Sequence, residues 1–519
     1  MWVLLFARAL RNTWVIAGWN WNSGYCMSLL GLDIGTSGCK ILAVSVDGAV
    51  LGEKYIPHSP GHPESGYAEL DSSAVWDSVK NLLQYAAGVT AADPAAALSV
   101  SSFGEAVVPV SMAREILGQS ILGSDIRGEK YSDKLKEQIS EKDFYEINPN
   151  IISLCYTYPK TAWIRDNNPR LFDETDKFLH WADFINFMLG AEAYASNSLA
   201  NRSLLFNLKE NDWSDELFSR TGMDRDKFAD IADGGSVVGV ISRGMAGDLG
   251  LPGNMQLVAG GHDQCLNAPG SGAIRPGSAV CGIGTFECIT PVFTLPNDVQ
   301  PLRRMGLNIE HHVLPNLYPS FIYNQAGAVL NWFQQIISGG GGNGGPDIIQ
   351  LEKEIPEEPT GLFTLPYFEP TGSPGFVNDM CGGIIGMKTS TTRGDMFKSV
   401  MESVVYYFHE VIQDVSKEGI TFNEFTATGG GGKSVPWLQI HADVFGVPFK
   451  QPEITEGSAL GAALLAGLGT GVWDNAEDAV KGFVKIKRVI EPDMKKHRQY
   501  QDLSERYRKI YKGVRSGWV

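Results

Sequence analysis

Short apolar runs separated by tight turns open the interpretable part of the chain. The runs Leu29–Gly35 and Lys40–Val46 are mainly apolar, and a third run follows at Ala49–Lys54. Asp47-Gly48 separates the second run from the third. An Asp-Gly pair between two apolar runs indicates a tight hairpin, because both central turn positions need positive φ. The pattern predicts three consecutive antiparallel strands, with Gly35-Thr36-Ser37-Gly38 as the first turn.

The same arrangement recurs near the middle of the chain. Ser278–Ile283 is apolar, Gly284-Thr285 supplies a turn, and Cys288–Phe293 is apolar again. Both turns carry the tripeptide Ile-Gly-Thr, at 34–36 and at 283–285. A shared tripeptide in two matching strand–turn–strand contexts predicts a duplicated unit.

Helical periodicity is clearest in the last quarter of the chain. One broad apolar stripe at helical spacing comprises Met396, Phe397, Val400, Met401, Val404, Val405, Phe408, Ile412 and Val415. A second, C-terminal amphipathic helix is marked by Tyr500, Leu503, Tyr507 and Ile510. The Gly-rich stretch 338–346 is predicted to be a mobile loop. We place the domain boundary near 265–275, which gives an N-terminal lobe at 28–270 and a C-terminal lobe at 271–512.

The first residues differ from the rest of the chain. No acidic residue precedes Asp33, and the apolar pieces Val3–Phe6 and Val15–Ala17 are far shorter than the ~18 residues of a membrane span. They are also too short for the core of a signal peptide. We interpret residues 1–27 as a non-native or disordered extension, with Met27 as the working initiator; a transit peptide is the alternative.

Composition excludes several classes of protein. The 59 acidic residues outnumber the 43 Lys and Arg residues, for a net charge of −16, which argues against a general nucleic-acid binder. Seven cysteines with no CxxC pair predict reduced thiols in a cytoplasmic protein, and the histidines show no zinc-ligand spacing. Glycine is abundant, at 59 residues in short clusters between apolar runs. That distribution suits both tight turns and backbone-lined ligand loops.

Two Gly-rich segments imitate known nucleotide motifs. Gly282-Ile283-Gly284 begins a dinucleotide fingerprint, but Glu287 occupies the position of its third glycine and a strand follows in place of a helix. Residues 427–434 nearly match GxxxxGK[ST] and include Lys433. Too little chain follows for a P-loop domain, and no apolar run ends in a magnesium-binding Asp. We therefore discount both motifs.

The two Gly-Thr turns offer a more coherent way to hold a phosphate. A Gly turn exposes backbone N–H groups, and the adjacent hydroxyl of Thr36 or Thr285 adds a donor. We predict that the turns face each other across a cleft. Asp33, on the strand before the first turn, is suited to hold a hydrated Mg²⁺ beside those phosphates, although a purely structural role would be the reading for an isolated Asp.

Several motifs together resemble the FGGY carbohydrate kinases of the actin/Hsp70/sugar-kinase superfamily. Gly31–Ser37 through Lys40 is similar to the first phosphate motif of that family, and Gly282–Thr285 to the second. The adenosine motif and its partner helix are matched by Thr428–Gly431, Trp437–Gln439, Ala442–Gly446 and Gly457–Ala463. The C-terminal signature is matched by Gly382-x-Ile384-x-Gly386-Met387, Asp395-Met396 and Ser399–Glu402. The resemblance covers roughly residues 28–512.

The resemblance implies an α/β fold of two ribonuclease-H-like (actin-like ATPase) lobes around a central cleft, with sugar on the first lobe and ATP on the second. It implies that Asp263 is the general base, and it makes Glu105, Gln264, Asp125 and Arg127 candidates for binding the sugar. Implied contacts to ATP are Thr36, Lys40, Gly284, Thr285, Gly327, Asn331, Gly430 and Ser434, with Mg²⁺ at Asp33. Lys433 becomes a surface or edge residue. His262 is more simply a hydrogen-bonded turn histidine than a functional one.

Departures from the family pattern bear on the substrate. Gly104 stands where glycerol kinases carry Arg, and Gly104-Glu105 replaces the Met-His pair of xylulokinases, so neither glycerol nor D-xylulose is favoured. The expected activity is ATP-dependent phosphorylation of a C4–C6 ketose or polyol. The alternative is an actin- or Hsp70-like ATP-binding switch without sugar phosphorylation. The expected partner is the small-molecule sugar or polyol, with neither nucleic acid nor membrane; assembly as a homodimer is left open.

Overall fold

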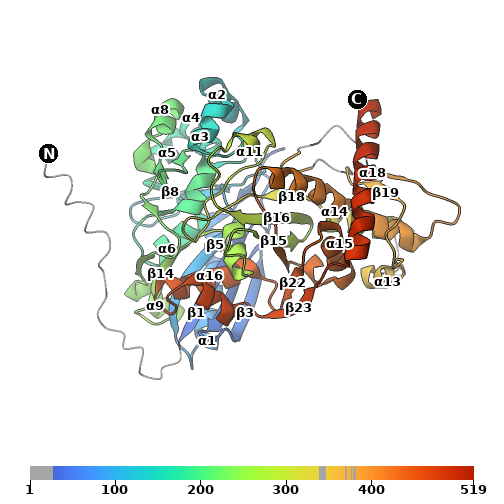
Figure 1. Cartoon of the computed structure of the whole chain (residues 1–519). Helices are drawn as coiled ribbons and strands as arrows, with labels where there is room; N and C mark the ends of the chain where they lie inside the picture. Colours follow the sequence, from blue (N-terminus) through green and yellow to red (C-terminus); the bar gives the residue numbers. More distant parts are fainter. Residues whose placement is uncertain (1–26, 338–346, 369–370, 376, 378–381, 519) are drawn as a thin grey trace.

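The computed structural model describes residues 27–337, 347–368, 371–375, 377 and 382–518. Its two large β-sheets lie in two bodies flanked by helices (Figure 1). The extension before Met27 and the loop predicted at 338–346 lie outside the described residues.

The first sheet confirms the predicted N-terminal strands. Its order is β13-β14-β5-β1-β2-β3, in which β1 is antiparallel to β2 and parallel to β5. The turn at 35–38 joins β1 to β2, and Asp47-Gly48 joins β2 to β3, with Gly48 at φ +83°. In sheet order the strands span Val237–Val240, Gln256–His262, Ala95–Ser102, Ser28–Gly35, Gly38–Ser45 and Val50–Pro57.

The second sheet repeats this connectivity. Its order is β17-β16-β15-β21-β22-β23, with β18 also paired to β16. Here β15 is antiparallel to β16 and parallel to β21, as β1 is to β2 and β5. In sheet order the strands span Tyr318–Pro319, Phe286–Phe293, Ser278–Ile283, Glu424–Thr428, Phe449–Pro452 and Ile486–Ile490, and β18 spans Ile322–Gln325. The predicted duplication is therefore confirmed.

Helices cover both sheets. On the first sheet, α1 (Ser72–Val89) and α6 (Trp181–Leu189) bury one face, including alternate β1 residues such as Leu30 and Leu32. On the second, α14 (Arg393–Lys417), α15 (Val435–Phe445) and the C-terminal α18 (Met494–Trp518) pack with the strands. The apolar stripe and the C-terminal helix predicted from periodicity correspond to α14 and α18.

One helix from the C-terminal half packs on the first sheet. Leu29 of β1 shares a core with Leu460 and Leu464 of α16 (Gly457–Gly469). Gly31 allows this approach, because a Cβ there would lie 1.9 Å from the Ala459 carbonyl oxygen. Helix α10 (Asp263–Gly270) packs against α16 in turn. The two helices thus bring both halves of the chain together beside β1.

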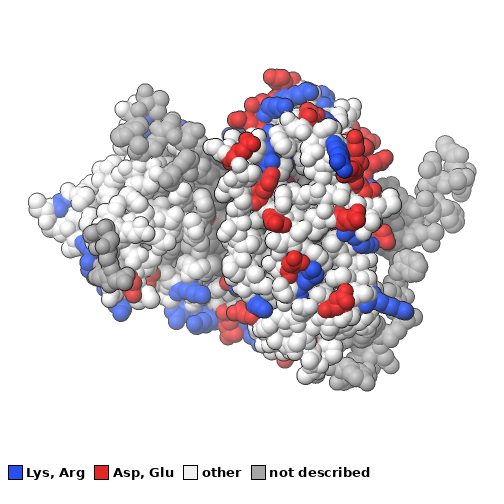
Figure 2. Space-filling model, turned by 180° about the vertical axis from the view of Figure 1, so that it is seen from behind, with Lys and Arg blue, Asp and Glu red and all other residues white. Residues whose placement is uncertain are grey.

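Charged side chains of both signs are interspersed over the face seen in Figure 2. Among the helices of the described part of the chain, none combines the length and apolar character required to cross a bilayer.

Candidate active site

Asp33 lies on the face of β1 that looks toward helix α16. Side chains alternate along a strand, so Leu29, Gly31 and Asp33 share this face while Leu30 and Leu32 point to the core. The Ser101 hydroxyl donates a 2.7 Å hydrogen bond to Asp33 Oδ1. Burial raises the pKa of the Asp33 carboxyl to about 6, and the nearby charge of Glu456 adds to that rise.

Lys40 sits opposite Asp33 in the hairpin register. Its ammonium forms an ion pair with Glu456, at 3.1 Å, in the residue that precedes α16. Lys40 therefore ties β2 of the first half to the start of a helix from the second half. Thr36, in the adjoining turn, is exposed.

Asp263 is the first residue of α10, directly after β14. The Gln264 backbone N–H donates to Asp263 Oδ1 at 2.6 Å, and the Asp263 side chain keeps 28% of its surface exposed. Burial raises the pKa of the Asp263 carboxyl to about 8, and the charge of Asp33 is the next cause. A carboxyl group that is partly exposed and has a raised pKa is suited to accept a proton near neutral pH.

Asp263 is also close to the second sheet. Burial first, and then the charge of Asp263 among other groups, raises the pKa of the Cys288 thiol on β16 to about 12. Asn267, one helical turn after Asp263, lies 3.9 Å from where a Cβ on Gly282 of β15 would stand. The carboxylate therefore lies at the join of the two sheets, within electrostatic reach of strands from each.

The second turn is exposed at Gly284 and Thr285. The Gly327 N–H donates to the Gly284 carbonyl oxygen at 3.0 Å, where α12 (Gly327–Ile337) begins. A Cβ at Gly327 would lie 2.4 Å from that oxygen, so this contact requires glycine. Asn331 follows one turn later on the same helix and is exposed.

Glu105 belongs to a buried charge cluster that the sequence did not predict. Arg202, in a short 3-10 turn, forms ion pairs with Glu105 and with the fully buried Glu310. Burial alone raises the pKa of Glu105, but the charges of Arg202 and Lys160 outweigh it and hold that pKa below its ordinary value. Arg202 and Lys160 carried no motif signal: the first stands in a run of small and apolar residues, and the second in a degenerate family signature.

Asp125 and Arg127 form an ion pair with each other. The Arg127 guanidinium donates to Asp125 and pairs with Glu69 at 2.6 Å, and its carbon lies 4.3 Å from the ring centre of Tyr67. Asp125 is fully buried and also accepts a hydrogen bond from the Ala68 N–H. Both side chains are engaged within the described chain, and their part in binding the sugar stays a prediction. Gln264 is the second residue of α10, directly after Asp263.

The segment after β21 contains the predicted adenosine contacts. Gly430 lies at φ −62°, and a Cβ there would have no atom of the described chain within 4 Å. Ser434 accepts a hydrogen bond from Trp437 N–H as the cap of α15, and its hydroxyl donates to Glu352. Lys433 is exposed, as predicted for a surface or edge residue.

The carboxylates of Asp33 and Asp263 provide a donor set that fits a divalent cation. Each acid carries a raised pKa, and Lys40, whose charge acts on Asp33, is already paired with Glu456. Hard cations such as Mg²⁺ take oxygen ligands, and their positive charge offsets the repulsion between two neighbouring carboxylates. Asp33, with its Ser101 partner, is the residue that would hold the ion.

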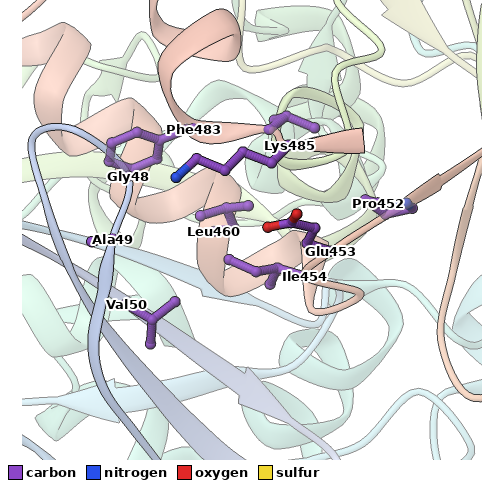
Figure 3. Close-up of a pocket in the computed structure, with 10 residues that line it drawn as sticks. Gly48, Ala49, Val50, Pro452, Glu453, Ile454, Leu460, Phe483 and Lys485 are labelled. Carbon is purple, nitrogen blue, oxygen red and sulfur yellow. The ribbon is translucent and has the colours of Figure 1, made fainter. Parts of the chain in front are cut away.

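A separate cavity of about 160 Å³ lies where the β2–β3 turn meets the C-terminal half (Figure 3). Gly48, Ala49 and Val50 line it from the first sheet, and Glu453 and Lys485 direct charged groups toward it. None of the predicted site residues lines this cavity. It is therefore distinct from the cluster around Asp263.

The two like sheets, each with an exposed Gly-Thr turn beside it, are those of an actin-like ATPase fold. Two family descriptions match the chain: the N-terminal domain of the FGGY family of carbohydrate kinases over residues 28–270, and its C-terminal domain over residues 315–470. The protein belongs to the FGGY family of carbohydrate kinases, and so is a phosphotransferase.

Individual relatives agree with this assignment. The chain is 28% identical to a xylulose kinase of Staphylococcus epidermidis over 93% of this chain and 96% of that protein. It is 26% identical to a glycerol kinase of Nitratidesulfovibrio vulgaris, over 90% and 94%. The crystal structure of a xylulose kinase from Rhodospirillum rubrum superposes with a TM-score of 0.85 at 24% identity, covering 95% of this chain and 99% of that one.

Proposed function

We propose that the protein transfers the γ-phosphate of ATP to a hydroxyl group of a C4–C6 ketose or polyol, with Asp263 as the general base. The observation that carries this proposal is the position of Asp263. Asp263 is the first residue of α10, at the join of the two sheets. The charge of Asp33 on β1 helps to raise its pKa, and its side chain is partly exposed.

The chemistry requires a proton acceptor near the sugar. The hydroxyl oxygen forms a bond to the γ-phosphorus as the bond from that phosphorus to the β-phosphate oxygen breaks, and ADP leaves. The hydroxyl proton passes to the Asp263 carboxylate. Asp33 would hold Mg²⁺, which neutralises phosphate charge when bound. Closing the lobes excludes water that would otherwise accept the phosphate.

The predicted contacts divide between the two ligands. Thr36, Lys40, Gly284 and Thr285 are proposed to bind the phosphates. The remaining proposed ATP contacts are Gly327, Asn331, Gly430 and Ser434. Glu105, Gln264, Asp125 and Arg127 are proposed to bind the sugar, the last two as the ion pair that they form with each other. The lobes are proposed to divide at 270/271, as predicted from the sequence.

Membership of a carbohydrate kinase family favours this function over the ATP-binding switch. The relatives named as xylulose kinases and glycerol kinases do not fix the substrate, because Gly104-Glu105 departs from the pair expected for xylulose and the Arg expected for glycerol is absent. A coupled ADP-release assay over C4–C6 ketoses and polyols tests the proposal. Sugar-dependent ADP release supports the kinase; ATP hydrolysis that no sugar stimulates supports the switch.

A further inference from the structure

Three side chains of the kinds that bind metal ions meet beneath the second sheet. Cys281 lies on β15, Glu287 on β16 and His441 on α15, and all three are fully buried. Cys281 pairs with Ile289 and Glu287 with Ile283, so both ligand residues face the same side of the hairpin. The sulfur, a carboxylate oxygen and a ring nitrogen lie within 4.8 Å of one another. We call these three residues the Cys281 cluster.

The His441 ring is oriented like that of a metal ligand. Its Nδ1 lies 2.8 Å from the carbonyl oxygen of Trp437, one turn earlier on α15. A carbonyl oxygen only accepts, so Nδ1 carries a hydrogen. In a neutral ring Nε2 then has none, and it directs a lone pair at Glu287 Oε1, 2.9 Å away. Metal-binding histidines commonly donate their other N–H to a backbone carbonyl in this way.

The Glu287 carboxylate is incompletely satisfied by the groups around it. Oε1 faces His441 Nε2 and accepts a hydrogen bond from the Cys281 thiol at 3.3 Å. Oε2 is buried and has no hydrogen-bond partner among the described residues. The apolar core that includes Ile283 and Ile289 lies on this side of the sheet. A buried carboxylate is costly unless it is paired and hydrogen-bonded, so this one requires a positively charged partner.

We infer that the Cys281 cluster binds one Zn²⁺ ion through Cys281 Sγ, His441 Nε2 and the Glu287 carboxylate. Sulfur, nitrogen and oxygen donors together suit zinc, whereas Mg²⁺ prefers oxygen alone. Neighbouring donor atoms in a tetrahedral zinc site are about 3.3–3.6 Å apart. The separations in the cluster, 2.9 Å and 3.3 Å, differ from that by a few tenths of an ångström. Oε2 of Glu287 supplies the fourth donor atom.

Protons and charges balance at such a site. Burial, with the charge of Glu287, raises the pKa of the Cys281 thiol, so without an ion the thiol keeps its proton and donates it to Glu287. When Zn²⁺ binds, a bond forms between the ion and the sulfur, and the thiol proton leaves to solvent. The thiolate and the carboxylate then offset both positive charges of the ion, and His441 stays neutral. A site without net charge is compatible with the apolar core around it.

The ion fastens together two segments that are assigned to ATP. Cys281 and Glu287 lie on either side of the Gly284-Thr285 turn, and His441 lies on α15, which begins directly after Ser434. A structural ion here holds both segments in one rigid unit; this consequence rests on the proposed function, but the zinc site does not. No local motif could reveal the site, because His441 follows Glu287 by 154 residues.

The metal content of the full chain tests the inference directly. The protein is produced without a polyhistidine tag in zinc-supplemented medium, dialysed, and analysed for zinc by mass spectrometry. We expect about one Zn²⁺ ion per chain. Protein made with Co²⁺ in place of zinc should show the charge-transfer absorption of a thiolate bound to cobalt. Zinc at background level, or a cobalt spectrum without that absorption, would overturn the inference and leave a hydrogen-bonded Glu287–His441 pair.

Two variants locate the ion at the cluster. Cys281→Ser and His441→Gln each remove one ligand and should lower the affinity for zinc at least about 10-fold, a loss that changes around the ligands already reach. Both should also melt at a temperature that added zinc no longer raises, unlike the wild-type protein. If these variants do not fold, the zinc content and the cobalt spectrum of the wild-type protein decide.

Each variant has a matched control in the same half of the chain. Cys288→Ser removes a thiol from the residue after Glu287, whose side chain points to the opposite face of β16. His409→Gln removes a buried histidine of α14 that stacks on Phe445 of α15. Both controls should keep the zinc and the thiolate absorption. If folded ligand variants kept as much zinc as their controls, the ion would not be bound by the Cys281 cluster.

Discussion

The charge of Asp33 raises the pKa of Asp263, although the two carboxylates come from the first strand of the described chain and from a helix that follows the last parallel strand of the same sheet. This coupling places the proposed metal-holding residue and the proposed base in one small region. The repulsion between the two carboxylates favours binding of a cation between them. It also raises the pKa of Asp263, so this carboxylate takes up a proton more readily.

Replacing the base should abolish turnover without removing ATP binding. We expect Asp263→Ala to lower kcat by roughly 10²–10⁴ or more, because the sugar hydroxyl loses its proton acceptor. The start of α10 should persist, since His262 Nδ1 still accepts from Gln264 N–H. ATP affinity from calorimetry should be nearly unchanged. Near-normal turnover would remove Asp263 from its assigned role.

The two raised pKa values predict a pH-dependent stability of the ligand-free protein. Folding moves the pKa of Asp33 from 3.8 to about 6 and that of Asp263 from 3.8 to about 8. Between these limits the folded state holds protons that the unfolded state has lost, so the free energy of unfolding decreases as pH rises from about 4 to about 8.

Thermal melting without nucleotide checks this expectation. The melting temperature should fall over that range, and the fall should be smaller in Asp263→Asn, whose side chain cannot ionise. The variant should therefore be more stable than wild type at pH 8. If the difference in melting temperature between wild type and Asp263→Asn did not depend on pH, the raised pKa of Asp263 would be contradicted.

A side chain at Gly430 should act on ATP and leave the fold intact. A Cβ at this position has no protein neighbour within 4 Å, and its backbone angles suit any residue. We expect Gly430→Val to weaken ATP binding by about 10-fold, equivalent to about 1.4 kcal/mol, with little change in melting temperature. Calorimetry with ATP and with sugar separates the two ligands. If the affinity for ATP were unchanged, Gly430 would not belong to the adenosine-binding site.

Removing the Lys433 ammonium should have almost no effect. The side chain is exposed in a 3-10 turn and is assigned no phosphate contact. We expect kcat and KM for ATP of Lys433→Ala to stay within about twofold of wild type, as for most surface changes. A collapse of activity would restore the P-loop interpretation of residues 427–434.

The contact between β1 and α16 should be intolerant of a single methyl group. A Cβ at Gly31 would lie 1.9 Å from Ala459 O and 2.8 Å from Ala463 N, both backbone atoms. We expect Gly31→Ala to lower the free energy of unfolding by about 2 kcal/mol or more, measured by denaturant titration. Gly88→Ala, which meets open space inside a helix, should be neutral or stabilising. Equal effects of the two changes would contradict the packing argument.

The hairpins and their repeat were predictable because their signals are local. Ile-Gly-Thr and Asp-Gly each indicate a turn within four residues. The strands on either side show alternating apolar and polar residues or are apolar throughout. Arg202 was not predictable, because its partners Glu105 and Glu310 are distant in sequence. For the same reason the contacts that Arg127 makes beyond Asp125 could not be predicted. Only the folded chain shows that Glu69 and two aromatic rings engage the arginine.

The docking of α16 on β1 constrains how the polypeptide can be made. The first sheet cannot bury Leu29 or Val258 until residues 457–469 have been synthesised. A nascent chain that has just completed β14 therefore presents an uncovered apolar surface to the ribosome exit and to chaperones. Truncation before Gly457 should yield an aggregating fragment, and the two halves expressed separately should regain a native structure only when mixed.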